Sequence, residues 1–462
     1  MYLGRKKTIG VFLLSVWSAA IAVVVGLFDP FGLSSYTDQY SSNVFYNVVA
    51  PTYPTSSRSD VEVILLDDNL LNYFNTDWPL SYTYYLEVTR TAIAREPKVL
   101  IFDISFLDAR EDDFFEVFID YLADQDGRTE KIPILLAHGY SPSTKKSLHP
   151  LLEEAVHRNA HMQIVSPDRS IGQSVDGYYP IKDEYGFESV AFAAFEWSCN
   201  LKPSQRCKAA LKRLSKVTSF QVFWGSLPAP NNCTNDQSVI GSHTFDCSAF
   251  NQSVLMRLLK NFAAGFWGFD SRLELNNAPP FHAVLPAGTL ISAYVTKDGN
   301  SGHNVDFILI GSNFLAIDDY IETPIHQQID GVFLHAMALD NLLALGDRFI
   351  SEKDHETLQN LLEVLLIWAC IFAYIALRGI REHVTILGLV PETLFWVGAA
   401  LVNLAIAYAV FNFLGVPPVN TLGIISISGL STFGLQMEAA ILWRILGRNY
   451  LEIAPIPEGT EK

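Results

Sequence analysis

Residues 63–68 read Val-Ile-Leu-Leu-Asp-Asp, and residues 99–106 read Val-Leu-Ile-Phe-Asp-Ile-Ser-Phe. Each stretch begins with four apolar residues and then reaches an aspartate. Continuous apolar runs of this kind, without alternation between apolar and polar residues, are typical of strands buried on both faces in a parallel sheet. These two stretches therefore predict two strands of a buried parallel sheet.

The same pattern recurs along the middle of the chain, with helical patterns between the apolar runs. The first of the two strands is expected to cover residues 61–66. Further strands are expected at residues 132–137, 163–166, 220–224 and 307–311. Helices are expected at residues 82–96, 112–123, 151–156, 187–198, 206–216, 254–262 and 331–345. Strands that alternate with helices indicate an α/β domain with a mainly parallel sheet.

The two ends of the chain carry apolar stretches of a different length. About 20 apolar residues are needed for a helix to cross a bilayer. Four stretches approach or exceed this length: residues 8–28, 361–377, 395–413 and 421–443. Basic residues mark alternate sides of these stretches, namely Arg5, Lys6, Lys7, Arg378, Arg381, Arg444 and Arg448. This pattern predicts four transmembrane helices with both termini in the cytoplasm and a short tail over residues 444–462.

The first apolar stretch has a second interpretation. A cleaved signal peptide would end at a small-residue site, and Ala20-Ile-Ala22 fits one. The apolar run continues beyond that site to Phe28, which favours a retained anchor.

Composition and charge exclude several classes of protein. The chain has 462 residues, of which 49% are hydrophobic, and its formal net charge is −17; the mean hydropathy is +0.20. These values exclude a disordered chain, and the negative charge argues against nucleic-acid binding. Residues 1–28 carry +3 and residues 359–462 carry −2, which leaves −18 for residues 29–358. The middle of the chain is therefore expected to be an acidic, water-facing domain outside the cytoplasm.

Four of the five cysteines lie within one stretch of this domain: Cys199, Cys207, Cys233 and Cys247. An even number of clustered cysteines in an exported domain predicts two disulfides, with three possible connectivities. A zinc site is the alternative, but the chain has no Cys-x-x-Cys pair. Residues 199–250 are expected to form an insertion or a loop-rich flap.

Acidic residues gather where the expected strands end. Open α/β sheets bind ligands at the carboxyl ends of their strands, and carboxylates there can hold a hard cation. The alternative is structural, with the same carboxylates capping helices or pairing with basic residues. His335, in the last expected helix, is a ligand-site candidate or a buried core histidine. The candidate ligand-binding residues are therefore Asp67, Asp68, Asp103, Asp319 and His335.

Several of these motifs resemble the CHASE2 family of extracytoplasmic sensory domains. The resemblance lies in residues 63–68, Trp78-Pro79, residues 99–106, residues 307–312, Asp318-Asp-Tyr-Ile-Glu-Thr-Pro324 and Gly331-Val-Phe-Leu-His-Ala336. It spans about residues 36–346, and the three trailing apolar stretches fit the usual layout of the family. Members commonly have an arginine soon after the Trp-Pro pair, where this chain has Ser-Tyr-Thr-Tyr at residues 81–84.

The resemblance implies a sensor in the bacterial inner (plasma) membrane, with its domain in the periplasm or the extracellular space. Relatives usually carry a cytoplasmic output domain after the spans, whereas here residues 447–462 are too short to form one. We therefore expect a small ligand or a partner to bind the exported domain. Movement of the helix at residues 331–345 would then pass to a separate partner protein.

Two other functions are considered. The domain could be a structural subunit of a cell-envelope complex that uses the same fold for docking. It could also be a metal-dependent hydrolase that uses the aspartates. The chain has no G-x-x-x-x-G-K-[ST], G-x-G-x-x-G, His-Glu-x-x-His or G-x-S-x-G motif. We therefore expect no enzyme activity and no cofactor.

Overall fold

The structure is a computed structural model, and it falls into two compact units. One unit comprises residues 1–45 and 353–462, and the other comprises residues 46–352. Within them the structure describes residues 5–28, 33–110, 112–139, 147–168, 178–233, 237–240, 243–247, 252–267, 279–295, 305–314, 319–351, 356–381 and 392–431.

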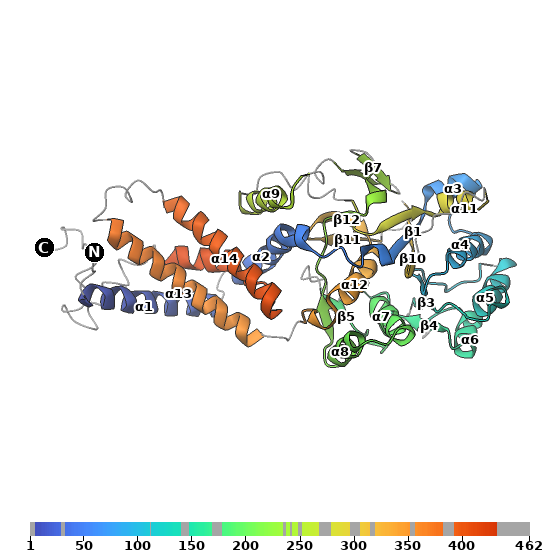
Figure 1. The fold of residues 1–462 in the computed structure, drawn as a ribbon, viewed down its shortest axis with the longest axis horizontal. Helices are drawn as coiled ribbons and strands as arrows, with labels where there is room; N and C mark the ends of the chain where they lie inside the picture. Colours follow the sequence, from blue (N-terminus) through green and yellow to red (C-terminus); the bar gives the residue numbers. More distant parts are fainter. Residues whose placement is uncertain are drawn as a thin grey trace. The chain divides into compact units, whose positions relative to one another are not determined.

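A six-stranded parallel sheet forms the centre of the unit at residues 46–352 (Figure 1). The strand order is β4-β3-β2-β10-β1-β9. The strands are β1 (Val61–Asp67), β2 (Val99–Phe102), β3 (Ile134–Ala137), β4 (Met162–Val165), β9 (Ala283–Pro286) and β10 (Phe307–Asn313). In the register of the central strands, Leu309 of β10 lies beside Val63 of β1 and Ile101 of β2. The predicted mainly parallel α/β domain is confirmed.

Helices cover both faces of the sheet. On one face lie α4 (Tyr82–Ala94), α5 (Phe114–Asp124), α6 (Pro150–Arg158) and α11 (Ala287–Val295). The other face contacts α7 (Val190–Leu201) and α12 (Val332–Leu345). Both faces of the strands are thus removed from water, which accounts for their continuous apolar sequences.

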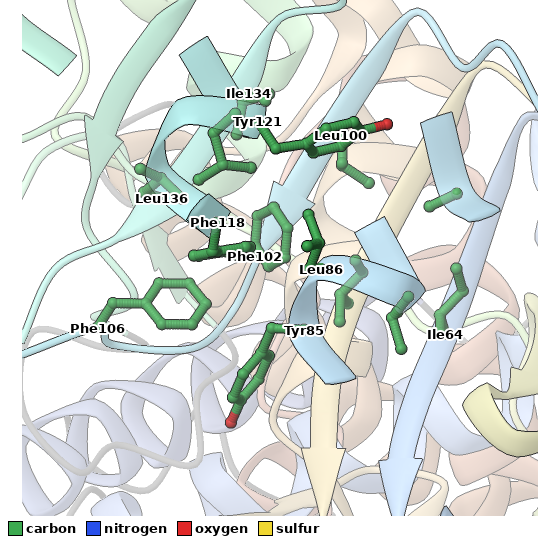
Figure 2. Packing of buried hydrophobic residues seen from close by; sticks show 14 of the residues in the cluster. Ile64, Tyr85, Leu86, Leu100, Phe102, Phe106, Phe118, Tyr121, Ile134 and Leu136 are labelled. Atoms are coloured by element: carbon green, nitrogen blue, oxygen red, sulfur yellow. The ribbon is translucent and has the colours of Figure 1, made fainter. Parts of the chain in front are cut away.

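Aromatic residues dominate the core beneath α4 and α5. Figure 2 shows Tyr85 and Leu86 of α4 beside Phe118 of α5, packed over Phe102 of β2. The rings of Phe102 and Phe118 lie 6.2 Å apart in an edge-to-face arrangement, which aromatic pairs favour.

The opposite face depends on one close approach between a strand and a helix. A Cβ atom on Gly311 of β10 would lie only 2.5 Å from Cβ of Val332 in α12. A larger residue at position 311 would therefore push the first turn of α12 away from the sheet.

Three two-stranded antiparallel sheets complete this unit. They pair β5 (Tyr178–Pro180) with β6 (Ser219–Gln221), β7 (Gln237–Ile240) with β8 (His243–Asp246), and β11 (Tyr320–Thr323) with β12 (His326–Asp330). The strand expected at residues 220–224 is thus β6, which lies outside the parallel sheet. The edge strand β9 was not predicted.

The cysteine region contains regular structure and two disulfides. Cys199 of α7 is bonded to Cys207 of α8 (Gln205–Leu214), and Cys233 is bonded to Cys247. This pairing selects one of the three possible connectivities. The stretch holds α8, β6, β7 and β8.

The other unit is helical. Its described helices include α1 (Arg5–Phe28), the part of α2 (Leu33–Val49) up to residue 45, α13 (Glu356–Arg381) and α14 (Glu392–Leu414). Two stretches have the length and hydropathy of membrane spans, Thr357–Leu377 and Leu394–Phe413. Two shorter apolar helices cover Val11–Val24 and Thr421–Ser431.

Two of the four expected membrane helices therefore meet these criteria. The end of the fourth expected span, at residues 432–443, lies outside the described residues. Four spans, and the position of the termini, remain predictions.

Candidate functional site

The carboxyl edge of the parallel sheet carries the candidate residues. Asp67 ends β1, Asp103 follows β2, and His138 follows β3. His335 reaches the same edge from the first turn of α12, as its contact with Asp103 shows. This is the edge at which open α/β sheets bind ligands.

Asp103 and His335 were both predicted as site residues, and the structure brings them together. Their closest atoms, Oδ1 of Asp103 and Nε2 of His335, lie 3.5 Å apart. On its other side the imidazole Nδ1 lies 2.6 Å from the hydroxyl of Tyr179. That hydroxyl also accepts a hydrogen bond from the backbone N–H of Ala191, at 3.2 Å.

These contacts favour one tautomer of the imidazole. The Tyr179 hydroxyl accepts from Ala191, so its own proton can be donated to Nδ1 of His335. The neutral ring then carries its proton on Nε2, facing Asp103. At 3.5 Å this is too long for a good hydrogen bond, and Nε2 has no other hydrogen-bond partner among the described residues.

Asp67 has a structural role. It is the N-cap of α3 (Asp68–Phe74), and its carboxylate accepts from the backbone N–H of Leu70 at 3.1 Å. Its other oxygen accepts from Asn69 at 3.0 Å. Burial raises the pKa of Asp67. Helix capping is one of the two roles considered for the strand-end carboxylates, and ligand binding by Asp67 remains a prediction.

Asp68 and Asp319 lie at the same edge in different settings. Asp68 is half-buried at the first position of α3. The backbone oxygen of Asp319 accepts from Gly331 at 2.8 Å, which ties the start of β11 to the start of α12. Asp318 lies outside the described residues.

Asp330 and Asn313 form a pair that sequence analysis missed. Asp330 ends β12 just before α12, and its Oδ2 accepts from Nδ2 of Asn313 at 2.8 Å. Its Oδ1 is buried without a hydrogen-bond partner in the described part of the chain. Burial raises the pKa of Asp330 to about 6. Asn313 lies beside Asp67 in the register of β10 and β1. Both strands therefore end in a polar residue, and this shared feature is the sequence signal that could have marked Asn313 as a site residue.

A second imidazole–carboxylate pair lies along this edge. Nε2 of His138 lies 2.6 Å from Oδ2 of Asp183, and both side chains are buried. Asp183 also accepts from the backbone N–H groups of Tyr185 and Phe187. Burial raises the pKa of the nearby Asp168, and the charge of Asp183 adds to this effect. In the described residues, no group of three or more His, Cys, Asp or Glu is placed to hold a metal ion.

A separate polar network lies at the amino edge of the sheet, at the other end of α12. Oδ1 of Asp340 accepts from the hydroxyl of Tyr53 at 2.6 Å, and Oδ2 lies 3.2 Å from Nε2 of His282. His282 directly precedes β9, which fixes this position at the amino edge. Burial, together with the charge of Asp340, raises the pKa of Tyr53 well above its usual value.

The next residue of α12 extends this network. The amide of Asn341 accepts from the backbone N–H of Phe223 at 2.8 Å and donates to its carbonyl at 3.0 Å. It also lies 3.2 Å from the Tyr53 hydroxyl. Asp340 and Asn341 therefore fix the end of α12 to three separate segments of the domain.

The helix α8 holds the chain where it leaves α12. Arg206 donates to the carbonyl of Ala344, and Arg213 donates to that of Asp347. The guanidinium of Arg213 also lies 4.5 Å from the ring centroid of Phe349. The disulfide at Cys207 joins α8 to α7, so the cysteine region contributes directly to the exit of α12.

One of the comparisons with known proteins gave a match. The family model described as the CHASE2 domain matches residues 18–377. Neither the curated proteins nor the solved structures gave a match. The match covers more than half of the chain, which therefore belongs to the CHASE2 family of extracytoplasmic sensory domains.

Proposed function

We propose that this chain is a membrane-anchored sensor that binds a small ligand beside Asp103 and His335 and signals through a separate partner protein. Membership of a sensory family supports the general role. Two helices with the length and hydropathy of membrane spans support the anchoring.

The observation that carries the proposal is the course of α12 through the domain. His335 near its start faces the carboxyl edge, and Asp340, five residues further along, belongs to the network at the amino edge. The 14 residues of α12 extend over about 21 Å, and His335 and Asp340 are separated by about 7.5 Å along the helix axis. The helix is buried along nearly its whole length. A close-packed helix transmits a displacement because its surroundings cannot absorb it locally.

The chain enters this domain and leaves it close to the second half of α12. Tyr53, which is hydrogen-bonded to Asp340, lies seven residues after the first residue of the domain. At the exit, the carbonyl of Ile350 accepts from the backbone N–H of Gln221 at 2.8 Å. A displacement of α12 would therefore act on both connections to the helical unit.

The polar groups at the carboxyl edge define what kind of ligand fits. Nε2–H of His335 is a donor, and the carboxylates of Asp103 and Asp330 are acceptors. A small polar ligand with both donor and acceptor groups would satisfy them. To shift an equilibrium, it must bind one position of α12 more tightly than another. A tenfold difference in affinity corresponds to about 1.4 kcal/mol.

We also propose that the chain has no enzyme activity. With the tautomer described above, the basic nitrogen of His335, Nδ1, is occupied by the Tyr179 hydroxyl. An imidazole that is held on its basic nitrogen is a poor general base, because that nitrogen must be free to take a proton.

The test is native mass spectrometry of the full chain, purified in a mild detergent. The chain should carry a small molecule that is lost in Asp103→Asn and in His335→Gln but retained in Asp124→Asn. Asp124 is an exposed aspartate at the end of α5 and serves as the matched control. Thermal unfolding checks that each variant is folded. A protein partner in fixed ratio, with no small molecule on any variant, would instead support the structural-subunit function.

A further inference from the structure

The helix α9 (Val254–Trp267) faces the domain with its polar side. Nη2 of Arg257 donates to the carbonyl and the hydroxyl of Ser226, at 3.0 and 2.7 Å. One turn further on, Nδ2 of Asn261 donates to the carbonyl of Asn47 at 2.8 Å. Both side chains are buried.

Among the apolar side chains of α9 that the structure describes, Phe262 is buried, but a stripe near the start of the helix faces away from the domain. Leu255, Met256 and Leu259 are 64%, 58% and 53% exposed. A surface helix of a water-soluble domain shows the opposite arrangement, with its apolar stripe inward and its polar face outward. Full burial of each of these side chains would contribute about 1.5–3 kcal/mol. The inverted helix therefore indicates that something apolar covers this side.

The position of α9 in the chain identifies what covers it. The helix packs beside η1 (Ala50–Thr52), and its partner Asn47 follows Phe45 by two residues. In the helical unit, the ring of Phe45 lies 5.4 Å from that of Phe411, which belongs to a candidate membrane span. Two residues of chain reach at most about 7 Å. The residue that α9 contacts, Asn47, is therefore only two residues along the chain from one that packs on a candidate membrane span.

Charge and area also favour lipid over protein as the covering surface. The helix has no acidic residue, although the chain carries 49 Asp and Glu, so no carboxylate would have to enter the headgroup layer. A stable protein interface buries about 800 Å² on each partner. Three side chains in one narrow stripe fall well short of that area, whereas interfacial helices bind lipid through a stripe of this kind.

We propose that α9 lies on the outer surface of the bilayer, with Leu255, Met256 and Leu259 at the boundary between headgroups and acyl chains. This proposal rests on the membrane anchoring in the proposed function but not on any ligand. It gives the domain a lipid contact next to the segment by which the chain enters it.

The experiment measures the depth of labelled positions in proteoliposomes of phosphatidylcholine made with the full chain. Cys370 is the free cysteine of the described residues, so a Cys370→Ser background is used. Leu255→Cys and Leu259→Cys are labelled in turn with a fluorophore that brominated acyl chains quench. Leu151→Cys on α6, at a site 43% exposed, is the matched control. Val402→Cys in α14, within a candidate span, reports the bilayer itself.

We expect at least twofold stronger quenching at positions 255 and 259 than at position 151. Quenching at position 402 but not at 255 and 259 would overturn the docking of α9 while leaving the membrane anchor intact. No quenching at position 402 would overturn the anchor and the docking together. If position 255 is shielded from solvent and the shielding disappears when the protein is diluted in lipid, this position contacts a second copy of the chain. That result would also overturn the proposal.

Discussion

The two ends of α12 differ in how completely their polar groups are paired. At the amino edge both carboxylate oxygens of Asp340 have partners, in Tyr53 and His282. At the carboxyl edge, Nε2 of His335 and Oδ1 of Asp330 are buried without a hydrogen-bond partner among the described residues. A buried polar atom left without a partner costs about 1–3 kcal/mol.

This difference indicates that the amino edge anchors α12 and that the carboxyl edge is the binding site. A complete network stabilises one arrangement and gains nothing from a further partner. An incomplete one carries a free-energy cost that a ligand can remove, so binding there can change which position of α12 is favoured. The amino edge of α12 is therefore expected to set stability, and the carboxyl edge to set the response.

The largest effect is expected at the amino edge. Asp340→Ala leaves the Tyr53 hydroxyl and the His282 imidazole without their shared partner in a fully buried position. We expect the free energy of unfolding to fall by about 3 kcal/mol, since breaking a buried network is far more costly than losing a surface group. Thermal or denaturant unfolding of the detergent-solubilised chain measures this. Asp124→Ala, at an exposed site, is expected to cost less than about 0.5 kcal/mol; equal losses in the two variants would contradict the anchor role.

A smaller effect of opposite sign is expected at the carboxyl edge. Burial raises the pKa of Asp330 from its usual 3.8 to about 6, so the folded state holds this proton more tightly than the unfolded state. The stability that Asp330 contributes is therefore fully present below about pH 4 and is lost as the pH rises through about 6. At about 1.36 kcal/mol per pKa unit, the loss is about 3 kcal/mol.

Asp330→Asn removes this dependence because the amide stays neutral. We expect the variant to be more stable than the natural chain at pH 8 by about 2 kcal/mol, slightly less than the full amount because an amide must reorient to accept from Asn313. At pH 4, where the carboxyl is largely protonated in the folded state, the variant should lose this advantage and be slightly less stable than the natural chain, because only the reorientation cost remains. Unfolding measured at both pH values decides this, and an advantage of the variant that is the same at both would rule out the ionisation of Asp330 as its cause.

Most of the fold could be predicted because its signals are local. The strand expected at residues 61–66 is β1, and the helix expected at residues 331–345 is α12 within one residue. Edge strand β9 escaped prediction because it follows closely on Pro279 and Pro280 and ends at Pro286, and prolines interrupt a strand pattern. The strand β6 was recognised, but its antiparallel partner β5 could not be identified from an apolar run alone.

The site could be predicted only in part, because its contacts join distant parts of the chain. Asp103 and His335 were both candidates because a strand end and a sequence motif marked them. Tyr179 was not, since it lies 156 residues before His335 and no local pattern connects the two. Cysteine pairing depends in the same way on where α7 and α8 lie in space, and sequence spacing leaves it open.

The smallest expected effect distinguishes two roles of Asp67 within the carboxyl edge. Asp67→Ala removes the N-cap of α3 and should lower the free energy of unfolding by about 1 kcal/mol. Asp67→Asn keeps a side-chain oxygen that can accept from Leu70, so it should be nearly neutral. Unfolding of both variants measures the capping role.

Native mass spectrometry of Asp67→Asn then tests ligand binding separately. If Asp67 only caps α3, this variant should retain the small molecule that Asp103→Asn loses. Loss of the molecule at unchanged stability would show that the charge of Asp67 also faces the ligand. The site would then extend from β2 across β10 to β1, because those three strands are adjacent in the sheet.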